Sequence, residues 1–518
     1  MIRTGLLLGT LSLLVPSFAS ADDAKPSGQL AIPFEKYELP NGMVVILSED
    51  HTVPMVAVNV MVKVGSHFEA EKRTGFAHLF EHLMFMGTDR VGSGKFDQLM
   101  EGEGGWNNAW TSEDRTDYFN VAPAHALPML LWLEADRLSS LGSSMTQEKL
   151  EAQRKVVRNE RRQTSENKPY GKVELRLPEL LYPEGHPYHH PVIGSHEDLE
   201  AATVEDVKKF FADHYASNNL SMVVAGDFDK ARVKADIERM FSGLKRASVP
   251  AAPTAAAPKL GKIVRETMVE ENIQLPKIIM AWHSPARFQP GDADLDVLSN
   301  VLDRGKTSRL YKALVFDKEL AQTVSAGQSS QDLSSIYQIE AIARPGVTLD
   351  ALEQEIDKVL KDVLDKGVTP AEVERAKNDY ETMFVLGLES VPERASTLNT
   401  YQTFAGDPGF IGKDLERYRR VDATSVAAAA KSTLDLGSRV IMRVEPKAEP
   451  PKEAAPKKDA LKKPDTAAKK DVVAKKDAAP KKDAAPKKKD AAAKKDGAPT
   501  KKDTAPKKDS APKKAGGK

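Results

Sequence analysis

Residues 74–86, TGFAHLFEHLMFM, place two histidines and a glutamate in an otherwise apolar segment. This spacing predicts a helix in which His78 and His82 project from one face, with Glu81 beside the second histidine. The remaining side chains are apolar nearly all round, which indicates a helix buried on most sides. Unpaired ionisable groups in such a helix would carry a large desolvation cost. A metal ion removes this conflict, because neutral imidazoles bind zinc and the carboxylate can face a zinc-bound water.

Two core histidines bonded to backbone carbonyls are the alternative interpretation of this segment. That arrangement would leave Glu81 needing a partner of its own in the same apolar helix, and buried carboxylates are rarely unpaired. We therefore interpret the HxxEH pattern at residues 78–82 as one part of a metal site.

A catalytic zinc site usually has three protein ligands and a water, so a further ligand is expected elsewhere. Residues 147–164 predict a helix on which Glu160 shares a face with Gln153 and Val156. We expect this face to be buried and to carry Glu160 inward as the third ligand. The glutamates that remain as alternatives are Glu148, Glu151 and Glu166.

The two ends of the chain differ from its body. Arg3, the apolar run of residues 6–15 and the small residues 19–21 predict a secretory signal peptide over residues 1–21. No later stretch approaches the roughly 20 apolar residues of a membrane span. We therefore expect an exported protein, periplasmic or extracellular. The chain has no cysteine, so disulfides and thiolate ligands are excluded in either compartment.

The formal net charge of zero hides a strong asymmetry. Residues 447–518 hold 24 Lys against 11 Asp and Glu, so this tail carries +13 and the rest of the chain −13. Its Lys, Asp, Ala and Pro residues cannot build a core, which predicts a disordered tail. The tail could bind anionic envelope polymers, lipid or nucleic acid, or it could be a solvated spacer.

Between these ends, the order of predicted strands and helices occurs twice. Residues 30–248 form the first predicted domain, a Pro/Ala linker covers 249–260, and a second domain covers 261–446. The repeated order suggests duplication and predicts an α+β fold with two related α/β halves, each a mostly antiparallel sheet packed with helices. The second half has no HxxEH, so only the first would bind metal.

Two further segments of the first half carry polar residues that bear on function. Residues 108–111 predict a short polar strand, which is either a plain hairpin edge or an edge that pairs with an extended peptide. His186, His189 and His190 lie among prolines in a loop without fixed helical spacing, so we expect them to have packing roles.

Taken together, these residues resemble the pitrilysin/insulysin family of zinc metallopeptidases (inverzincins), in the processing-peptidase-like branch of short bacterial chains. The resemblance covers about residues 34–446. It rests on the segments GFAHLFEHLMFMGT, GGWNNAWTSEDRTDYF, VVRNERRQTSENKPYG, HPYHHPVIGSHEDLEAATVEDVKKFFADHY and VLSNVLDRGKTSRLYKAL.

The resemblance implies a role for each candidate residue. His78, His82 and Glu160 would bind one zinc ion, and Glu81 would be the general base that activates a zinc-bound water. Asn108 and Ala109 match the edge segment that pairs with the substrate backbone. The family fold implies two halves that close like a clamshell over a peptide.

Two departures from the family pattern bear on function. A supporting glutamate two helical turns before the third ligand is Gln153 here, which implies weaker hydrogen-bonded support for that ligand. The arginine and tyrosine that self-sufficient members carry in their second half correspond to Val315 and Gln322. The resemblance therefore implies a catalytic subunit whose homologous, non-catalytic partner supplies both side chains. The competing hypothesis is a catalytically silent binding or assembly protein on the same fold.

Overall fold

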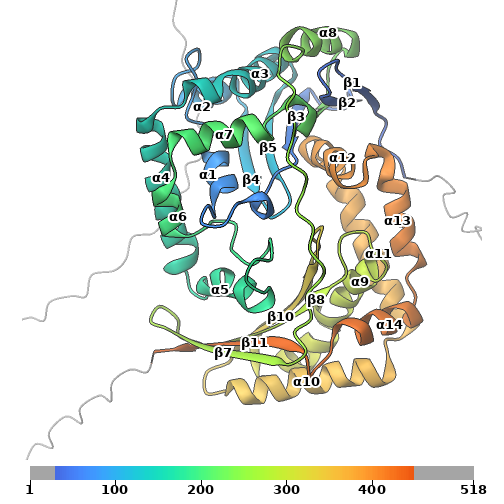
Figure 1. Ribbon diagram of the computed structural model, residues 1–518. Coiled ribbons are helices and arrows are strands. Elements are labelled where there is room, and N and C mark those ends of the chain that lie inside the picture. The colour runs from blue at the N-terminus through green and yellow to red at the C-terminus, as the bar shows by residue number, and fades with distance from the viewer. Residues whose placement is uncertain (1–29, 448–518) are drawn as a thin grey trace, which may run out of the picture. The chain divides into compact units, whose positions relative to one another are not determined.

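A computed structural model describes residues 30–447, which form two α/β halves, each built around its own sheet (Figure 1). The strands of the first sheet are β1 (Glu35–Glu38), β2 (Val44–Glu49), β3 (Met55–Val62), β4 (Trp106–Thr111), β5 (Thr116–Pro123) and β6 (Leu220–Gly226). Those of the second sheet are β7 (Ile263–Glu270), β8 (Lys277–Ser284), β9 (Ala321–Ser329), β10 (Ser335–Ala343) and β11 (Arg439–Pro446).

The second sheet repeats the first strand by strand. The spatial orders are β1-β2-β6-β3-β5-β4 and β7-β11-β8-β10-β9, so only β1 has no counterpart. Each sheet has one parallel pair at the same place, β2 with β6 and β7 with β11, and all other pairs are antiparallel. The predicted fold class, two related halves with mostly antiparallel sheets packed with helices, is confirmed.

Helices cover both sheets. The first half contains α1 (Phe76–Leu83), α2 (Lys95–Gly102), α3 (Leu127–Ser144), α4 (Gln147–Arg161), α5 (Lys172–Leu181), α6 (His196–Ala201), α7 (Val204–His214) and α8 (Lys230–Phe241). The second half contains α9 (Asp292–Asp303), α10 (Leu349–Lys366), α11 (Pro370–Gly387), α12 (Val391–Ala405), α13 (Ile411–Arg420) and α14 (Ala423–Thr433). None of the helices within residues 30–447 has the length and apolarity needed to cross a bilayer.

Each half packs one of its helices against the sheet of the other half. Val391, Ala395 and Leu398 of α12, in the second half, pack on a face of the first sheet that includes Ile46 and Val223. Spacings of four and three residues place these three side chains on one side of the helix. Each large side chain buried in this way contributes roughly 1.5–3 kcal/mol.

The reciprocal contact is made by α5 of the first half. Its residues Val173, Leu177 and Leu181 pack on the second sheet against apolar residues that include Ile279 and Val440. Each sheet is therefore covered on one face by a helix from the other half, which joins the two halves through apolar cores.

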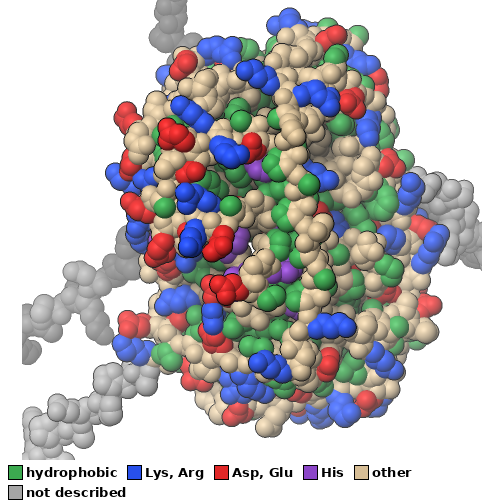
Figure 2. Space-filling model, viewed as in Figure 1, with side chains coloured by type: hydrophobic (Ala, Val, Ile, Leu, Met, Phe, Trp, Pro, Cys, Tyr) green, Lys and Arg blue, Asp and Glu red, His purple; other side chains and the backbone are tan. Residues whose placement is uncertain are grey.

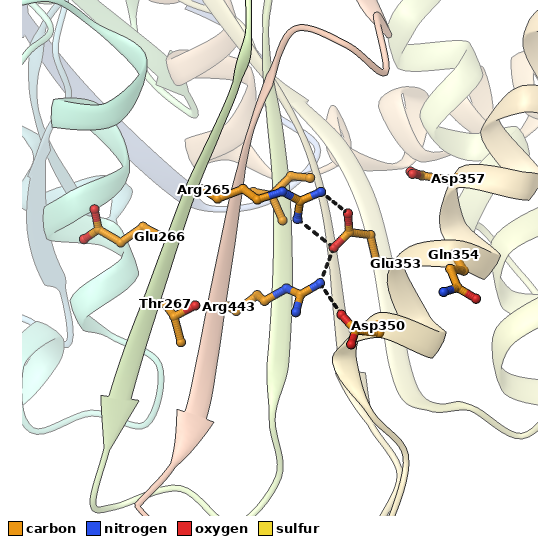
Figure 3. Close-up of a pocket in the computed structure, with 9 residues that line it drawn as sticks. Arg265, Glu266, Thr267, Asp350, Glu353, Gln354, Asp357 and Arg443 are labelled. Atoms are coloured by element: carbon orange, nitrogen blue, oxygen red, sulfur yellow. Dashed lines mark hydrogen bonds and ion pairs between the residues drawn. The ribbon is translucent and has the colours of Figure 1, made fainter.

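Ion pairs connect α10 to β7, the edge strand of the second sheet, and to its neighbour β11 (Figure 3). Glu353 of α10 accepts hydrogen bonds from Arg265 of β7 at 2.6 Å and from Arg443 of β11 at 2.5 Å. Asp350 lies 2.7 Å from Arg443, and these charges line a cavity of about 440 Å³. Burial raises the pKa of Glu353, but the two guanidinium groups outweigh it and lower the pKa to about 2.

Residues 249–260 connect the two sheets without a helix or strand. The predicted signal peptide (1–21) and all but the first residue of the predicted tail (447–518) lie outside the described residues.

Replacing Glu353 with Gln removes the charge that both arginines contact, and we expect a loss of roughly 2 kcal/mol of unfolding free energy. Because the folded-state pKa of Glu353 is lowered from 4.5, its stabilisation is complete above about pH 4.5 and is lost as the pH falls toward 2. Thermal unfolding of wild type and Glu353→Gln should therefore differ at pH 7 and converge as the pH falls below 4.5.

Glu381→Gln is the matched control, because Glu381 pairs with Arg419 on the surface, where both side chains are 40% exposed. Such pairs contribute little, so this variant should unfold within about 0.5 kcal/mol of wild type. Equal stability of Glu353→Gln and wild type at pH 7 would contradict the assignment.

Candidate metal centre

Helix α1 presents the two histidines of the HxxEH pattern on one side. The rings of His78 and His82 lie with their centroids 4.8 Å apart and nearly perpendicular to each other. The helix is otherwise embedded in the core of the first half through Phe76, Leu79 and Leu83. In Figure 2 several histidine side chains are visible near the middle of one face, among interspersed acidic and basic residues.

Helix α4 brings Glu160 to both imidazoles. Its carboxylate oxygens lie 3.1 Å from Nε2 of His82 and 3.8 Å from Nε2 of His78. One potential ligand atom from each of these three residues lies within 4.8 Å of the others, which is the only such cluster in residues 30–447.

The route by which Glu160 reaches the site differs from the sequence prediction. The prediction of a buried face containing Val156 is wrong, because that side chain is 47% exposed. The buried residues of α4 are Leu150, Arg154 and Val157, so Glu160 stands at the margin of the buried stripe. From that position its side chain, which is 33% exposed, reaches the two histidines of α1.

The three alternative glutamates lie elsewhere. Glu151 pairs with Arg154 at 3.0 Å, and Glu166 pairs with Arg161 and His196, each at 2.9 Å. Glu148 is exposed in the first turn of α4.

The electrostatics of the cluster fit a zinc ion. Burial and the neighbouring His82 lower the pKa of His78 to about 4, so this imidazole is neutral at pH 7. The close approach of His82 lowers the pKa of Glu160, which keeps its carboxylate ionised. Nδ1 of His78 and Oε2 of Glu160 are buried without a well-formed hydrogen bond. Neutral imidazoles and an ionised carboxylate form a typical zinc donor set.

Glu81 lies next to the cluster and is held from the opposite side. It is 9% exposed, and burial raises the pKa of its carboxyl group. The hydroxyl of Thr111, the last residue of β4, donates a hydrogen bond of 2.5 Å to Oε2 of Glu81. Sequence reasoning missed this contact, because nothing local to Thr111 identifies a partner 30 residues away.

Strand β4 is the edge of the first sheet and pairs only with β5. The backbone N–H of Ala109 donates to the side-chain oxygen of Asn108 at 2.9 Å, and Asn108 is exposed. Strand β4 therefore presents a free edge close to Glu81. On this edge the N–H of Ala109 is already bonded to the side chain of Asn108.

Comparison with known proteins identifies the family of this chain. Residues 44–188 match the model of the insulinase family (peptidase family M16), and residues 201–380 match that of the M16 inactive domain. The zinc protease PqqE of Helicobacter pylori is 31% identical over 400 residues, covering 76% of this chain and 88% of that protein. The chain belongs to the insulinase family.

Solved structures of other proteins share the fold of this chain. A protease from Helicobacter pylori aligns with a TM-score of 0.76 at 27% identity and covers 80% of this chain and all of that one. The periplasmic protease PqqL of Escherichia coli aligns with a TM-score of 0.66 at 17% identity. That alignment covers 80% of this chain but only 48% of PqqL.

Within this insulinase-family site, the amino end of α1 is held by a residue that sequence reasoning missed. Glu69 accepts hydrogen bonds from the backbone N–H groups of Gly75 and Ala77, at 2.8 and 2.7 Å. Of the two residues whose types predict the start of this helix, Thr74 and Gly75, the N-cap is Gly75, whereas the hydroxyl of Thr74 donates to Asp198 at 2.5 Å. A carboxylate at a helix amino end is stabilised by the unpaired N–H groups there.

The remaining predicted residues lie around the site. The side-chain amide of Gln153 donates to Sδ of Met86 at 2.6 Å, beyond the carboxyl end of α1. The packing role predicted for the loop histidines is confirmed for His186 and His189, and Nδ1 of His190 lies 3.6 Å from Glu69. His186 stacks on Tyr182 with ring centroids 4.6 Å apart, and Nδ1 of His189 lies 2.8 Å from the carbonyl oxygen of Tyr182.

Substituting Glu160 with Gln keeps the size of the side chain and removes its negative charge. We expect zinc affinity to fall at least tenfold, because the site then offers two imidazoles and the uncharged, weaker amide oxygen in place of the carboxylate. Zinc content measured by mass spectrometry after dialysis against a mild chelator provides the test.

Glu151→Gln is the control on the same helix, because Glu151 pairs with Arg154 instead. It should retain zinc like the wild type. Full zinc occupancy in Glu160→Gln would exclude Glu160 as a ligand.

Proposed function

We propose that this chain is an exported zinc-dependent endopeptidase that hydrolyses peptides or small unfolded polypeptides. The observation that carries the proposal is the convergence of His78, His82 and Glu160 beside the buried carboxylate of Glu81. Family membership supports a peptidase role.

When bound, zinc would supply Lewis-acid chemistry that acidifies water and stabilises negative charge on a carbonyl oxygen. His78, His82 and Glu160 would hold the ion. Glu81 would take a proton from the attacking water and deliver it to the leaving amine, as a general base and then a general acid. The hydroxyl of Thr111 fixes the orientation of the Glu81 carboxylate during this transfer.

The free edge of β4 offers a place for the substrate backbone. An extended peptide could add to this edge by strand pairing, which needs no particular side-chain sequence. The N–H of Ala109 would exchange the side-chain oxygen of Asn108 for a substrate carbonyl. Because β4 ends at Thr111, a peptide on this edge would pass close to Glu81.

Glu81→Gln should bind zinc as the wild type does but lose about 10² to 10⁴-fold in kcat, because the amide cannot accept the proton. Cleavage of an internally quenched peptide, measured together with zinc content, gives both quantities. If Glu81→Gln cleaves peptides normally, Glu81 is not the base. If wild type holds zinc and cleaves nothing tested, a binding or assembly role becomes the better account.

We further propose that the active form includes a homologous subunit. The chain spans about half of PqqL, and Val315 and Gln322 stand where an arginine and a tyrosine are expected. Val315 is partly buried and Gln322 is exposed on β9, and neither offers a charged or phenolic donor. A partner would supply both groups.

Affinity purification from the native host should recover a second chain of the same family, and its addition should raise the peptidase activity of the isolated protein at least tenfold. Full activity of the isolated chain, with no homologous chain recovered, would contradict this proposal.

We also propose that residues 1–21 direct export of the protein. The tail, residues 447–518, would contact anionic envelope polymers, lipid or nucleic acid.

A further inference from the structure

The turn between β4 and β5, residues Ser112 to Arg115, is held first by its own half. The backbone N–H groups of Ser66 and His67 donate to the carbonyl oxygens of Ser112 and Glu113, at 3.1 and 3.0 Å. The turn passes so close to Gly65 that a Cβ there would lie 2.3 Å from the carbonyl oxygen of Glu113. This side of the turn is therefore fixed through backbone contacts.

Asp114 ties the same turn to the second half. It is 2% exposed, and its Oδ2 accepts a hydrogen bond of 3.1 Å from the backbone N–H of Asp332, in the turn between β9 and β10. Its Oδ1 accepts a hydrogen bond from the hydroxyl of Tyr188. That hydroxyl in turn accepts from the backbone N–H of Leu333 at 3.1 Å. One buried carboxylate thus satisfies two donors and connects residues 218 positions apart.

Arg115, the next residue, makes a second connection to the second half. Its Nη1 donates to the hydroxyl of Thr400 on α12 at 2.8 Å. Its guanidinium lies 4.4 Å from the ring centroid of Trp110 and 5.0 Å from that of Phe404. The turn is therefore attached to both the β9–β10 turn and the exchanged helix α12.

These attachments lie three and four residues from Thr111, whose hydroxyl donates to Glu81. We propose that Asp114 is a positioning residue for the reaction, because it fixes the end of β4 against the second half and so holds Thr111 on the carboxylate of Glu81. The expected effect of Asp114 on turnover rests on the proposed peptidase function. Its structural part, the anchoring of β4 from the second half, is independent of that function.

Loss of the carboxylate would leave the hydroxyl of Tyr188, which is 2% exposed, without its acceptor, and would remove the bond to the N–H of Asp332. The backbone contacts of Ser66 and His67 would remain, so the hairpin would stay formed but less fixed. A shift of about 1 Å at a residue that orients a catalytic group can lower turnover about a hundredfold.

The test compares Asp114→Ala, Asp114→Asn and Tyr188→Phe with the control Tyr170→Phe. The hydroxyl of Tyr170 also makes a contact between the halves, donating to the carbonyl oxygen of Leu275 at 2.8 Å. We expect kcat to fall at least tenfold in Asp114→Ala and about threefold in Tyr188→Phe, with KM and zinc content within twofold of wild type. Asp114→Asn keeps one acceptor oxygen and should recover part of the loss, and Tyr170→Phe should match wild type.

Hydrogen–deuterium exchange of peptides covering residues 106–116 decides the structural part without any assay of catalysis. Asp114→Ala and Tyr188→Phe should each speed exchange there by at least fivefold, whereas Tyr170→Phe should not. Unchanged exchange in both variants, or an equal change in the control, overturns the inference even if the protein is an active peptidase. Faster exchange in Asp114→Ala and Tyr188→Phe, together with a wild-type protein that cleaves no peptide, would instead retain the anchoring and reject the proposed function.

Discussion

A buried helix can hold two imidazoles and a carboxylate only if the surrounding structure compensates for removing them from water. In this protein each element around α1 supplies part of that compensation. Helix α4 provides the ionised carboxylate of Glu160, β4 provides the hydroxyl of Thr111, and Glu69 satisfies the backbone at the amino end. His78, His82 and Glu160 together offer a set of ligand atoms that suits a divalent cation.

The second half contributes to this site without carrying any ligand. Its helix α12 covers one face of the first sheet, and α5 of the first half covers the second sheet in return. This exchange joins the halves by apolar burial, and the buried Asp114 adds a polar connection at the turn that ends β4. The edge strand near the metal centre is thus contacted by both halves, including the half that carries none of the three candidate ligands.

The parts predicted correctly from the sequence are those determined by local pattern. The spacing of His78, Glu81 and His82 in an apolar segment predicts the helix and the common face of its two histidines, and the recurring order of strands predicts the two halves. The burial of Val156 was predicted wrongly because helical phase alone does not say which side of α4 has a neighbour. Capping by Glu69 and the contact of Asp114 with Asp332 depend on residues brought together by folding. Helix α5 contains Pro178 and follows a loop rich in breakers, so no periodic signal identifies it.

X-ray absorption spectroscopy at the zinc edge, on protein purified with one equivalent of zinc, tests the central claim most directly. The account predicts a four-coordinate ion with two imidazole nitrogens and one carboxylate oxygen at about 2.0–2.2 Å and one water oxygen. A spectrum without imidazole scattering, or a protein that retains no zinc under these conditions, would contradict it.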